Sequence, residues 1–350
     1  MLKTIMHPAD SRPPQPGGIT RIPGFALLAV ISLAILSLLP VMDYHYYADA
    51  ARAWWHGHSK LYDAAAPQFF YFPWSLVLIV PLSFLTDRWG QAVFNVISLA
   101  CLIWAVRRLS FKVSWRALAL SLATPFTAAV LYLGQWDGLI VAGVALGWHA
   151  IERHKSWLLG VAFVILATKP TNAFLPAALL VWAMRTWPPR DMVRAALPPG
   201  IVLAGSFFAC GADWPLRYAA SLRSSPPLGY DVSVWTLKVG TPWLVLLVVV
   251  IVGAVVHLVR KNGVTGEALS YALAANLVVS PFVVPYHYVT AAPALAVLAN
   301  RNWRVAAMVW ILSAVLFRAF LLRQPGLHLV AYPLILLTAL LAVRAPAAPP

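Results

Sequence analysis

Long runs of apolar residues with almost no charge are the dominant feature of this sequence. Several span about 16–20 residues, which approaches the length of a helix that crosses the hydrocarbon core of a bilayer. Across the 350 residues, 61% are hydrophobic and only 11% are charged. A soluble domain carries roughly 25% charged residues. The sequence therefore predicts an all-α, polytopic membrane protein.

Apolar runs and the residues that interrupt them predict about twelve transmembrane helices. They fall near 22–41, 89–106, 115–132, 138–151, 156–168, 171–186, 194–210, 240–259, 267–284, 286–299, 303–321 and 327–343. Residues 22–343 are thus expected to form a single transmembrane domain. We interpret the Pro- and Gly-rich stretch 1–21 as a disordered cytoplasmic tail, and 344–350 as a second cytoplasmic tail.

The segment "FFYFPWSLVLIVPLSFL" (69–85) is apolar enough to cross, but Pro73 and Pro81 interrupt it. A proline inside a helix removes a backbone hydrogen bond and clashes with the preceding turn. If 69–85 crosses, every later basic loop lies outside; if it re-enters or lies in the interface, most of the 26 Lys and Arg residues lie inside. Because cytoplasmic loops are enriched in Lys and Arg, the second reading is favoured.

This topology gathers the non-basic polar residues on the outer face. That face includes an outer loop over 42–88, a second over 211–239, and the short stretches "GQWD" (134–137), "KPTN" (169–172) and "VPYHY" (284–288). The pattern predicts a functional site that faces away from the cytoplasm. The net charge of +15 is explained by the inner loops, so nucleic-acid binding is not expected. Cys101 and Cys210 lie in apolar runs and read as core residues.

Asp43 in "VMDYHYYADAARAWWHGHSKLY" follows directly after the first apolar run. Partial burial there would raise the pKa of its carboxyl group toward the range useful for a general base. The alternative is a solvated loop carboxylate. Asp49 lies six residues further on, which is not a same-face spacing in a helix. Arg52 suits an anionic head group, although snorkelling to the interface would also account for it.

Gln135 and Asp137 lie in "YLGQWDGL" at the junction of two expected spans. Polar groups inside a membrane are costly, so we expect them to bind hydroxyl groups; a helix cap at Asp137 is the alternative. Lys169 ends the run "VAFVILAT" and precedes Pro170. A lysine at such a broken helix can bind phosphate, and snorkelling is the competing explanation.

Two further outer stretches contain candidate residues. His287, between two tyrosines in "SPFVVPYHYVTAAP", could bond a phosphate or a sugar hydroxyl, or belong to an interfacial aromatic belt. Asp231 lies in the loop 211–239, which could close over a substrate. Aromatic residues of the first outer loop could stack on sugars or form the same belt; they are Tyr44, Trp54, Trp55, Tyr71 and Trp74. We find no nucleotide-binding, metalloprotease, serine-hydrolase or Cys/His metal motif.

The order of these motifs resembles the GT-C membrane glycosyltransferases, and among them glycosyltransferase family 87, the polyprenyl-phosphate-mannose-dependent type. The likeness covers most of 22–300: the Asp after the first span, "GQWDGLIVAGVALGWHAIERHKSWLLGVAFVILATKPT" and "SPFVVPYHY". It implies a GT-C-like bundle whose first outer loop contains juxtamembrane helices. It also implies that Asp43 is the catalytic base.

The resemblance implies a donor, an acceptor and a set of binding residues. The donor is a polyprenyl-phosphate sugar, with mannose as the first expectation, and the acceptor is an envelope glycolipid or glycan at the outer face of the plasma membrane. The expected donor-phosphate residues are Lys169, Arg52, His287 and Tyr286. The expected sugar and acceptor residues are Gln135, Asp137, Tyr44, His45, Asp49 and Asp231. Phosphate is a good leaving group, so no metal or other cofactor is expected.

Two other classes of function fit part of the pattern. A secondary transporter or lipid flippase would also contain broken helices and buried polar residues. However, such proteins need access from both sides and often contain internal repeats, which we do not detect. A non-catalytic scaffold of the cell envelope would leave Asp43 and Lys169 unexplained.

Overall fold

The computed structural model describes residues 22–57, 61–62, 69–110, 112–224, 231–237, 239–323 and 328–343. Within these ranges the chain is helical and contains no strand. The two expected tails, 1–21 and 344–350, lie outside the described residues. The α-helices are α1 (Ile22–Leu36), α2 (Tyr44–Trp55), α3 (Leu76–Ser83), α4 (Asp87–Leu109), α5 (Trp115–Leu122), α6 (Pro125–Leu133), α7 (Asp137–Glu152), α8 (Ser156–Ala167), α9 (Phe174–Met184), α10 (Pro189–Cys210), α11 (Trp214–Ser224), α12 (Thr241–Asn262), α13 (Gly266–Val279), α14 (Ala292–Arg301), α15 (Trp303–Leu321) and α16 (Ala331–Ala342). Four short 3-10 helices join them: η1 (Pro73–Ser75), η2 (Pro170–Asn172), η3 (Val234–Thr236) and η4 (Pro285–Ala291).

Each of the twelve expected spans coincides with a helix or with two consecutive helices. Four of the described helices, α4, α10, α12 and α15, are long and apolar enough to cross a membrane alone. The expected single span 115–132 is instead two helices, α5 and α6, bent by 57°, and together they make a fifth candidate crossing. Multiple membrane crossings are therefore confirmed, and the number twelve stays a prediction.

The break between α5 and α6 has a local cause. Pro125 opens α6, so its ring cannot follow a continuous helix, and Thr124 adopts an extended backbone before it. The Thr124 side chain accepts a hydrogen bond from the backbone N–H of Thr127 and caps the new helix. Pro125 was visible in the sequence, but the apolar run 115–132 was predicted as one continuous span.

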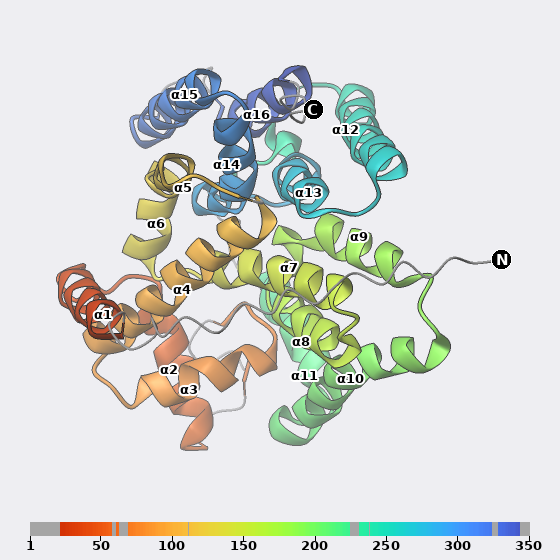
Figure 1. The fold of residues 1–350 in the computed structure, drawn as a ribbon. Helices are drawn as coiled ribbons and strands as arrows, with labels where there is room; N and C mark the ends of the chain where they lie inside the picture. The colour runs from red at the N-terminus through yellow and green to blue at the C-terminus, as the bar shows by residue number, and fades with distance from the viewer. Residues whose placement is uncertain are drawn as a thin grey trace, which may run out of the picture.

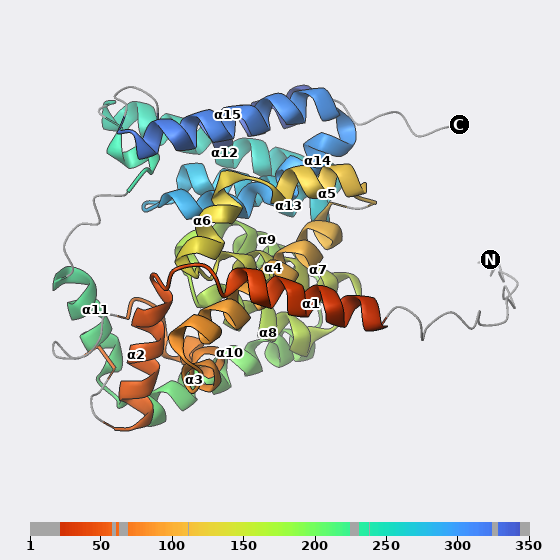
Figure 2. The ribbon, with the colours of Figure 1, turned by 90° about the vertical axis from the view of Figure 1, so that its left-hand side faces the viewer.

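The first outer loop contains two short helices, α2 and α3. With 8 residues, α3 is about 12 Å long, which is far short of the roughly 30 Å hydrocarbon core. Its contacts are mainly with α2, and Figure 2 shows α2 running across the direction of α1 rather than along it. Both features favour an interfacial position for 69–85.

Helix α13 lies in the interior of the bundle, with other helices packed around it (Figure 1). All of its residues from Gly266 to Val279 except Glu267 are buried, because α9, α12, α14, α16 and η4 pack around it. Nearby, α7 packs against α4, α8, α9 and η4. The start of α7 therefore lies near the breaks at η2 and η4, each of which opens with a proline.

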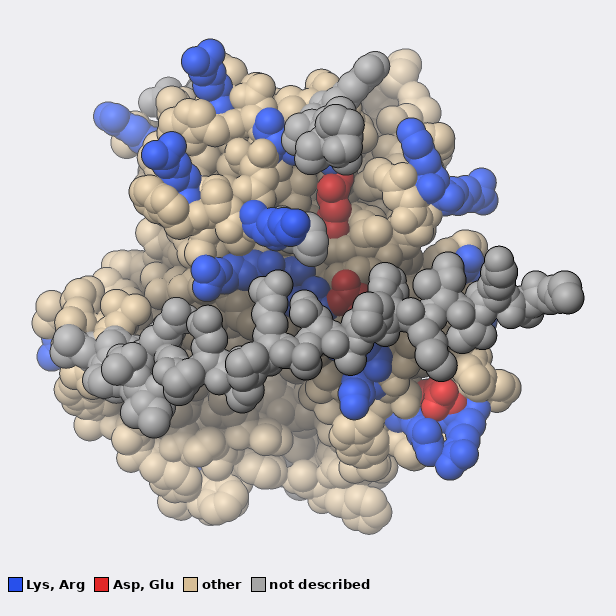
Figure 3. All heavy atoms as spheres, in the orientation of Figure 1, with Lys and Arg blue, Asp and Glu red and all other residues tan. Residues whose placement is uncertain are grey.

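Basic side chains gather on one face of the molecule. Figure 3 shows that face, which carries many Lys and Arg and few Asp or Glu among the described residues. Arg107 and Arg108 end α4, and α4 begins at the opposite end with Asp87, which is paired with Arg52 of α2. With 23 residues, α4 is about 34 Å long. The outer-loop helix α2 and the basic end of α4 thus lie about one bilayer thickness apart.

Candidate active site

Asp43 lies in the short connection between α1 and α2. Gln91 of α4 holds this connection, because its Nε2 donates to the carbonyl of Pro40 at 2.9 Å and its Oε1 accepts from the backbone N–H of Met42 at 3.2 Å. The Asp43 carboxylate makes no capping bond to α2. Its Oδ2 instead accepts a hydrogen bond of 2.5 Å from Nε2 of Gln135. The Asp43 carboxylate is therefore oriented by a side chain 92 positions later in the sequence.

Gln135 occupies the tight turn between α6 and α7. Gly134 before it has φ +73°, a left-handed conformation, and a Cβ there would come within 3.0 Å of the Tyr44 Cβ. Oε1 of Gln135 accepts from the Tyr71 hydroxyl at 3.1 Å, which turns its NH2 group toward Asp43. The Tyr71 hydroxyl also lies 3.1 Å from the hydroxyl of Tyr47. A buried chain of hydrogen bonds thus ends at the Asp43 carboxylate.

Lys169 and Asp137 form a buried ion pair beside this chain. Lys169 Nζ lies 3.0 Å from Asp137 Oδ2, and the two residues are 9% and 0% exposed. Asn172 Nδ2 donates to the other oxygen of Asp137 at 2.5 Å. The ammonium also lies 4.6 Å from the ring centroid of Tyr286 and 5.8 Å from that of Tyr71. Aromatic faces and one carboxylate therefore surround the cation.

His287 of η4 is 1% exposed and next to Tyr286. The backbone N–H of Val284 donates to its Nδ1 at 3.3 Å. A nitrogen that accepts a hydrogen bond carries no proton, so the neutral ring carries its proton on Nε2. Among the described residues Nε2 has no hydrogen-bond partner. His287 thus presents a buried N–H donor that is free to bond a ligand.

At both Asp43 and Lys169, the effect of burial on the pKa is opposed by the neighbouring charges. Burial raises the pKa of the Asp43 carboxyl above its ordinary value, although the hydrogen bond from Gln135 and the charge of Lys169 favour the ionised form. Burial likewise lowers the pKa of the Lys169 ammonium, and the carboxylates of Asp137 and Asp43 oppose that change. Asp43 is therefore a stronger base than a solvated carboxylate.

The structure brings together six of the eleven residues predicted from the sequence. Asp43, Gln135, Asp137, Lys169, Tyr286 and His287 lie on neighbouring segments around the Tyr71 ring and the Lys169 ammonium.

Arg52 and Asp49 form a separate group. The Arg52 guanidinium lies 2.6 Å from Asp49 and 2.8 Å from Asp87, and it also donates to the Ser83 carbonyl. These bonds fasten α2 to the end of α3 and the start of α4. Two carboxylates already neutralise Arg52.

Three other predicted residues have local partners. Tyr44 is fully buried against Phe94. His45 Nδ1 lies 2.5 Å from the carbonyl of Met42. Asp231 accepts from the backbone N–H groups of Ser233 and Val283, at 2.9 and 3.2 Å, and so joins the second outer loop to the extended residues before η4.

Sequence reasoning missed Gln91, Tyr47 and Asn172, and it considered Tyr71 only as a possible sugar platform. Asn172 had a signal, because it follows Lys169 by three residues in "KPTN". Gln91 was also visible as an uncharged polar residue in a long apolar helix, where such residues face partners inside the bundle. Tyr47 had no signal that separated it from its tyrosine neighbours.

The cluster combines a partly buried base, a buried cation and a neutral N–H donor. Within the described ranges, no three His, Cys, Asp or Glu side chains are close enough together to hold a metal ion. The independence from metal stays a prediction. The arrangement places a carboxylate of raised pKa, a group able to accept a proton, beside an ammonium and an N–H donor, which are groups able to bind an anion.

Comparison with known proteins supplies a family. The crystal structure of ArnT from Cupriavidus metallidurans bound to undecaprenyl phosphate aligns with 93% of this chain and 70% of that chain, with a TM-score of 0.48 and 17% identity. The Alpha-(1->3)-arabinofuranosyltransferase of Corynebacterium glutamicum is 23% identical over 164 residues, which cover 43% of this chain and 38% of that protein. The match thus spans well under half of the relative's length. The model of glycosyltransferase family 87 matches residues 69–285, which is more than half of the chain. The chain therefore belongs to glycosyltransferase family 87.

Proposed function

We propose that this protein is an integral membrane glycosyltransferase that uses a polyprenyl-phosphate sugar as donor. The acceptor is an envelope glycolipid or glycan at the non-cytoplasmic face of the plasma membrane, and mannose is the first sugar to test. Family membership supports the reaction class. The observation that carries the mechanism is the proximity of the Asp43 carboxylate, held by Gln135, to the buried ammonium of Lys169.

In this mechanism Asp43 takes the proton from an acceptor hydroxyl. The resulting oxygen attacks the anomeric carbon while the bond from that carbon to the phosphate oxygen breaks, so the configuration inverts. Polyprenyl phosphate leaves with the bonding electron pair. The proton remains on Asp43 until it is lost to solvent, which completes the balance of the reaction.

The departing phosphate needs positive charge and hydrogen-bond donors. Lys169 supplies the charge, and Nε2–H of His287 supplies a donor that nothing in the described chain occupies. Tyr286 lies between them, with its ring 4.6 Å from the Lys169 ammonium. Asp137 and Asn172 hold Lys169 in place when the donor is absent.

Of the remaining predicted residues, Gln135 has a supporting role and the others stay predictions. Gln135 bonds the base, which leaves it a supporting role rather than a direct contact with the acceptor. Asp231, Tyr44, His45 and Asp49 stay predictions as sugar- or acceptor-binding residues. Arg52 stays a prediction for the donor phosphate, and it would have to release Asp49 or Asp87 to bind one.

The test measures sugar transfer by the purified protein in lipid vesicles. Labelled polyprenyl-phosphate mannose and polyprenyl-phosphate arabinose serve as parallel donors, with an envelope glycolipid as acceptor. Asp43→Asn should abolish transfer. Asp191→Asn is the matched control, because it removes an exposed carboxylate at the start of α10 that is not among the candidate site residues, and it should keep most of the activity.

Two results would overturn the proposal. Full transfer by Asp43→Asn would remove Asp43 as the base. Movement of intact donor lipid across the vesicle membrane, with no transfer from any polyprenyl-phosphate sugar, would indicate the flippase alternative instead.

A further inference from the structure

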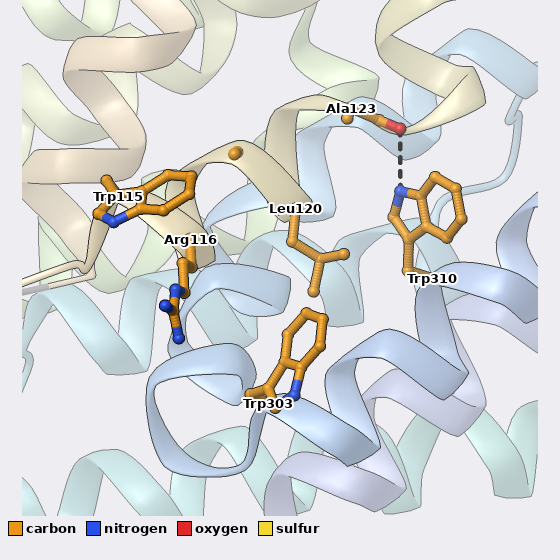
Figure 4. Close-up of a pocket in the computed structure, with 7 residues that line it drawn as sticks. Trp115, Arg116, Leu120, Ala123, Trp303 and Trp310 are labelled. Carbon is orange, nitrogen blue, oxygen red and sulfur yellow. Dashed lines mark hydrogen bonds between the residues drawn. The ribbon is translucent and has the colours of Figure 1, made fainter.

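A groove opens between α5 and α15, away from the Asp43 cluster. It encloses about 500 Å³ and is lined by Trp115, Arg116, Ala119, Leu120, Ala123, Trp303 and Trp310. Figure 4 shows Arg116 at one end, Leu120 above the Trp303 ring in the middle, and Trp310 at the other end. Apart from the guanidinium, the three indole N–H groups and the Ala123 carbonyl, the lining is apolar.

One hydrogen bond fixes the Trp310 end of the groove. Trp310 Nε1–H donates to the carbonyl of Ala123 at 2.9 Å, a bond drawn in Figure 4. That carbonyl belongs to the residue that ends α5, just before the break at Thr124 and Pro125. The bend between α5 and α6 therefore leaves an acceptor that ties α15 to α5 and fixes the spacing of the two walls.

The other end of the groove carries the positive charge of Arg116, which has no acidic partner among the described residues. Arg116 is exposed, and among the described residues its only interaction is with the Trp115 ring, whose centroid is 5.7 Å from its Cζ. Trp115 and Trp303 flank it and are 73% and 58% exposed. Arg304, also exposed, follows directly in the first turn of α15. A cation beside exposed indoles is typical of the level where lipid head groups meet the hydrocarbon.

The groove is also oriented as a bound lipid requires, with its charged end at the membrane surface and its apolar end further into the membrane. Its Arg116 end lies at the basic face, because the backbone N–H of Ser114, the N-cap of α5, donates to Asn300 beside the basic end of α14. From there α5 runs for 8 residues, or about 12 Å, along the protein surface toward Ala123. The charged end thus lies at head-group level and the apolar end at acyl-chain level.

We propose that this groove binds one anionic phospholipid of the surrounding bilayer. Its phosphate lies against Arg116, with Arg304 adding to the local positive charge, and one acyl chain lies along Leu120, Trp303 and Trp310. The leaflet on a basic face attracts anionic lipids by charge. A donor phosphate would have to reach Lys169 instead, whose cluster lies beside Ser98 in the middle of α4, 11 residues or about 16 Å along the helix from Leu109 at its basic end. The inference does not depend on the proposed function.

Native mass spectrometry of the delipidated protein tests the proposal, with phosphatidylglycerol and phosphatidylcholine as the probe lipids. Wild type should retain one tightly bound phosphatidylglycerol and prefer it to phosphatidylcholine. A hydrogen-bonded charge contributes about 1.5–3 kcal/mol, so Arg116→Ala should weaken that binding roughly tenfold or more. Arg190→Ala is the matched control, since Arg190 is exposed at the start of α10, away from the groove. It should bind as wild type does.

Two further variants keep the test decisive if Arg116→Ala does not fold. Arg116→Lys should retain most of the preference, because the charge remains. Leu120→Trp should fill the groove and weaken both lipids. Equal losses of phosphatidylglycerol binding in Arg116→Ala and Arg190→Ala would show that binding depends only on the general surface charge, and this would overturn the proposal. So would displacement of phosphatidylglycerol by undecaprenyl phosphate at equal concentration, because the groove would then be a donor site.

Discussion

Replacing Lys169 with Met would remove the cation from a buried ion pair and leave an apolar chain of similar length. Asp137 is fully buried and would lose the donor that lies 3.0 Å from its Oδ2. Breaking one side of a buried pair costs roughly 3–5 kcal/mol. Asn172 still donates to the carboxylate at 2.5 Å, so we expect a loss near the lower end of that range, about 3 kcal/mol.

Changing the other partner of the ion pair should lower the stability by less than Lys169→Met does. In Asp137→Asn, the amide oxygen can still accept a hydrogen bond from Lys169. The cation also keeps the faces of Tyr286 and Tyr71, and a cation–π contact contributes about 0.5–2 kcal/mol. The double variant buries no unpaired charge, so it should recover most of the stability lost in Lys169→Met.

Denaturation by sodium dodecyl sulfate in mixed micelles measures these differences, with sugar transfer followed in parallel. If Lys169 serves the donor phosphate, the double variant should be stable and inactive. An unfolding midpoint of Lys169→Met equal to that of wild type would refute the reasoning about the ion pair. Recovery of transfer in the stable double variant would show that Lys169 only supports the fold.

Four further outcomes follow from the geometry. Because burial raises the pKa of Asp43 and only its ionised form accepts a proton, transfer should fall as the pH drops through that raised pKa. Gln135→Leu removes a hydrogen bond to the ionised form, so the acid limb of the pH–rate profile should move to higher pH; an unchanged limb would contradict this. Gly134→Ala should destabilise the protein by about 1–2 kcal/mol in the same denaturation assay, because its φ is +73° and a Cβ would press on Tyr44. Arg52→Ala should lower stability by only about 1 kcal/mol, since both of its ion pairs are partly exposed, and a loss several times larger would mean that the pairs are better shielded than their exposure indicates.

Several elements of the fold followed directly from local sequence. Hydropathy alone located the helices that coincide with the twelve expected spans, because a helix in lipid must satisfy every backbone hydrogen bond within its own segment, but it did not locate α2 or α11. Charge parity favoured a first outer loop that does not cross, and the 8-residue α3 agrees with that reading. The bend at Pro125 also has a local cause, but the hydropathy of 115–132 read as one continuous span.

The sequence by itself determined that this chain is a helical membrane protein, with an acid after the first span and a lysine at a broken helix. Only the tertiary structure decided how these groups meet. Gln135 bonds Asp43 across 92 positions, and Lys169 pairs with Asp137 across 32. Hydropathy reports whether a residue enters the membrane and carries no information about which helices become neighbours. Those contacts depend on the packing of α7, η2 and η4 around the buried α13, which no local pattern encodes.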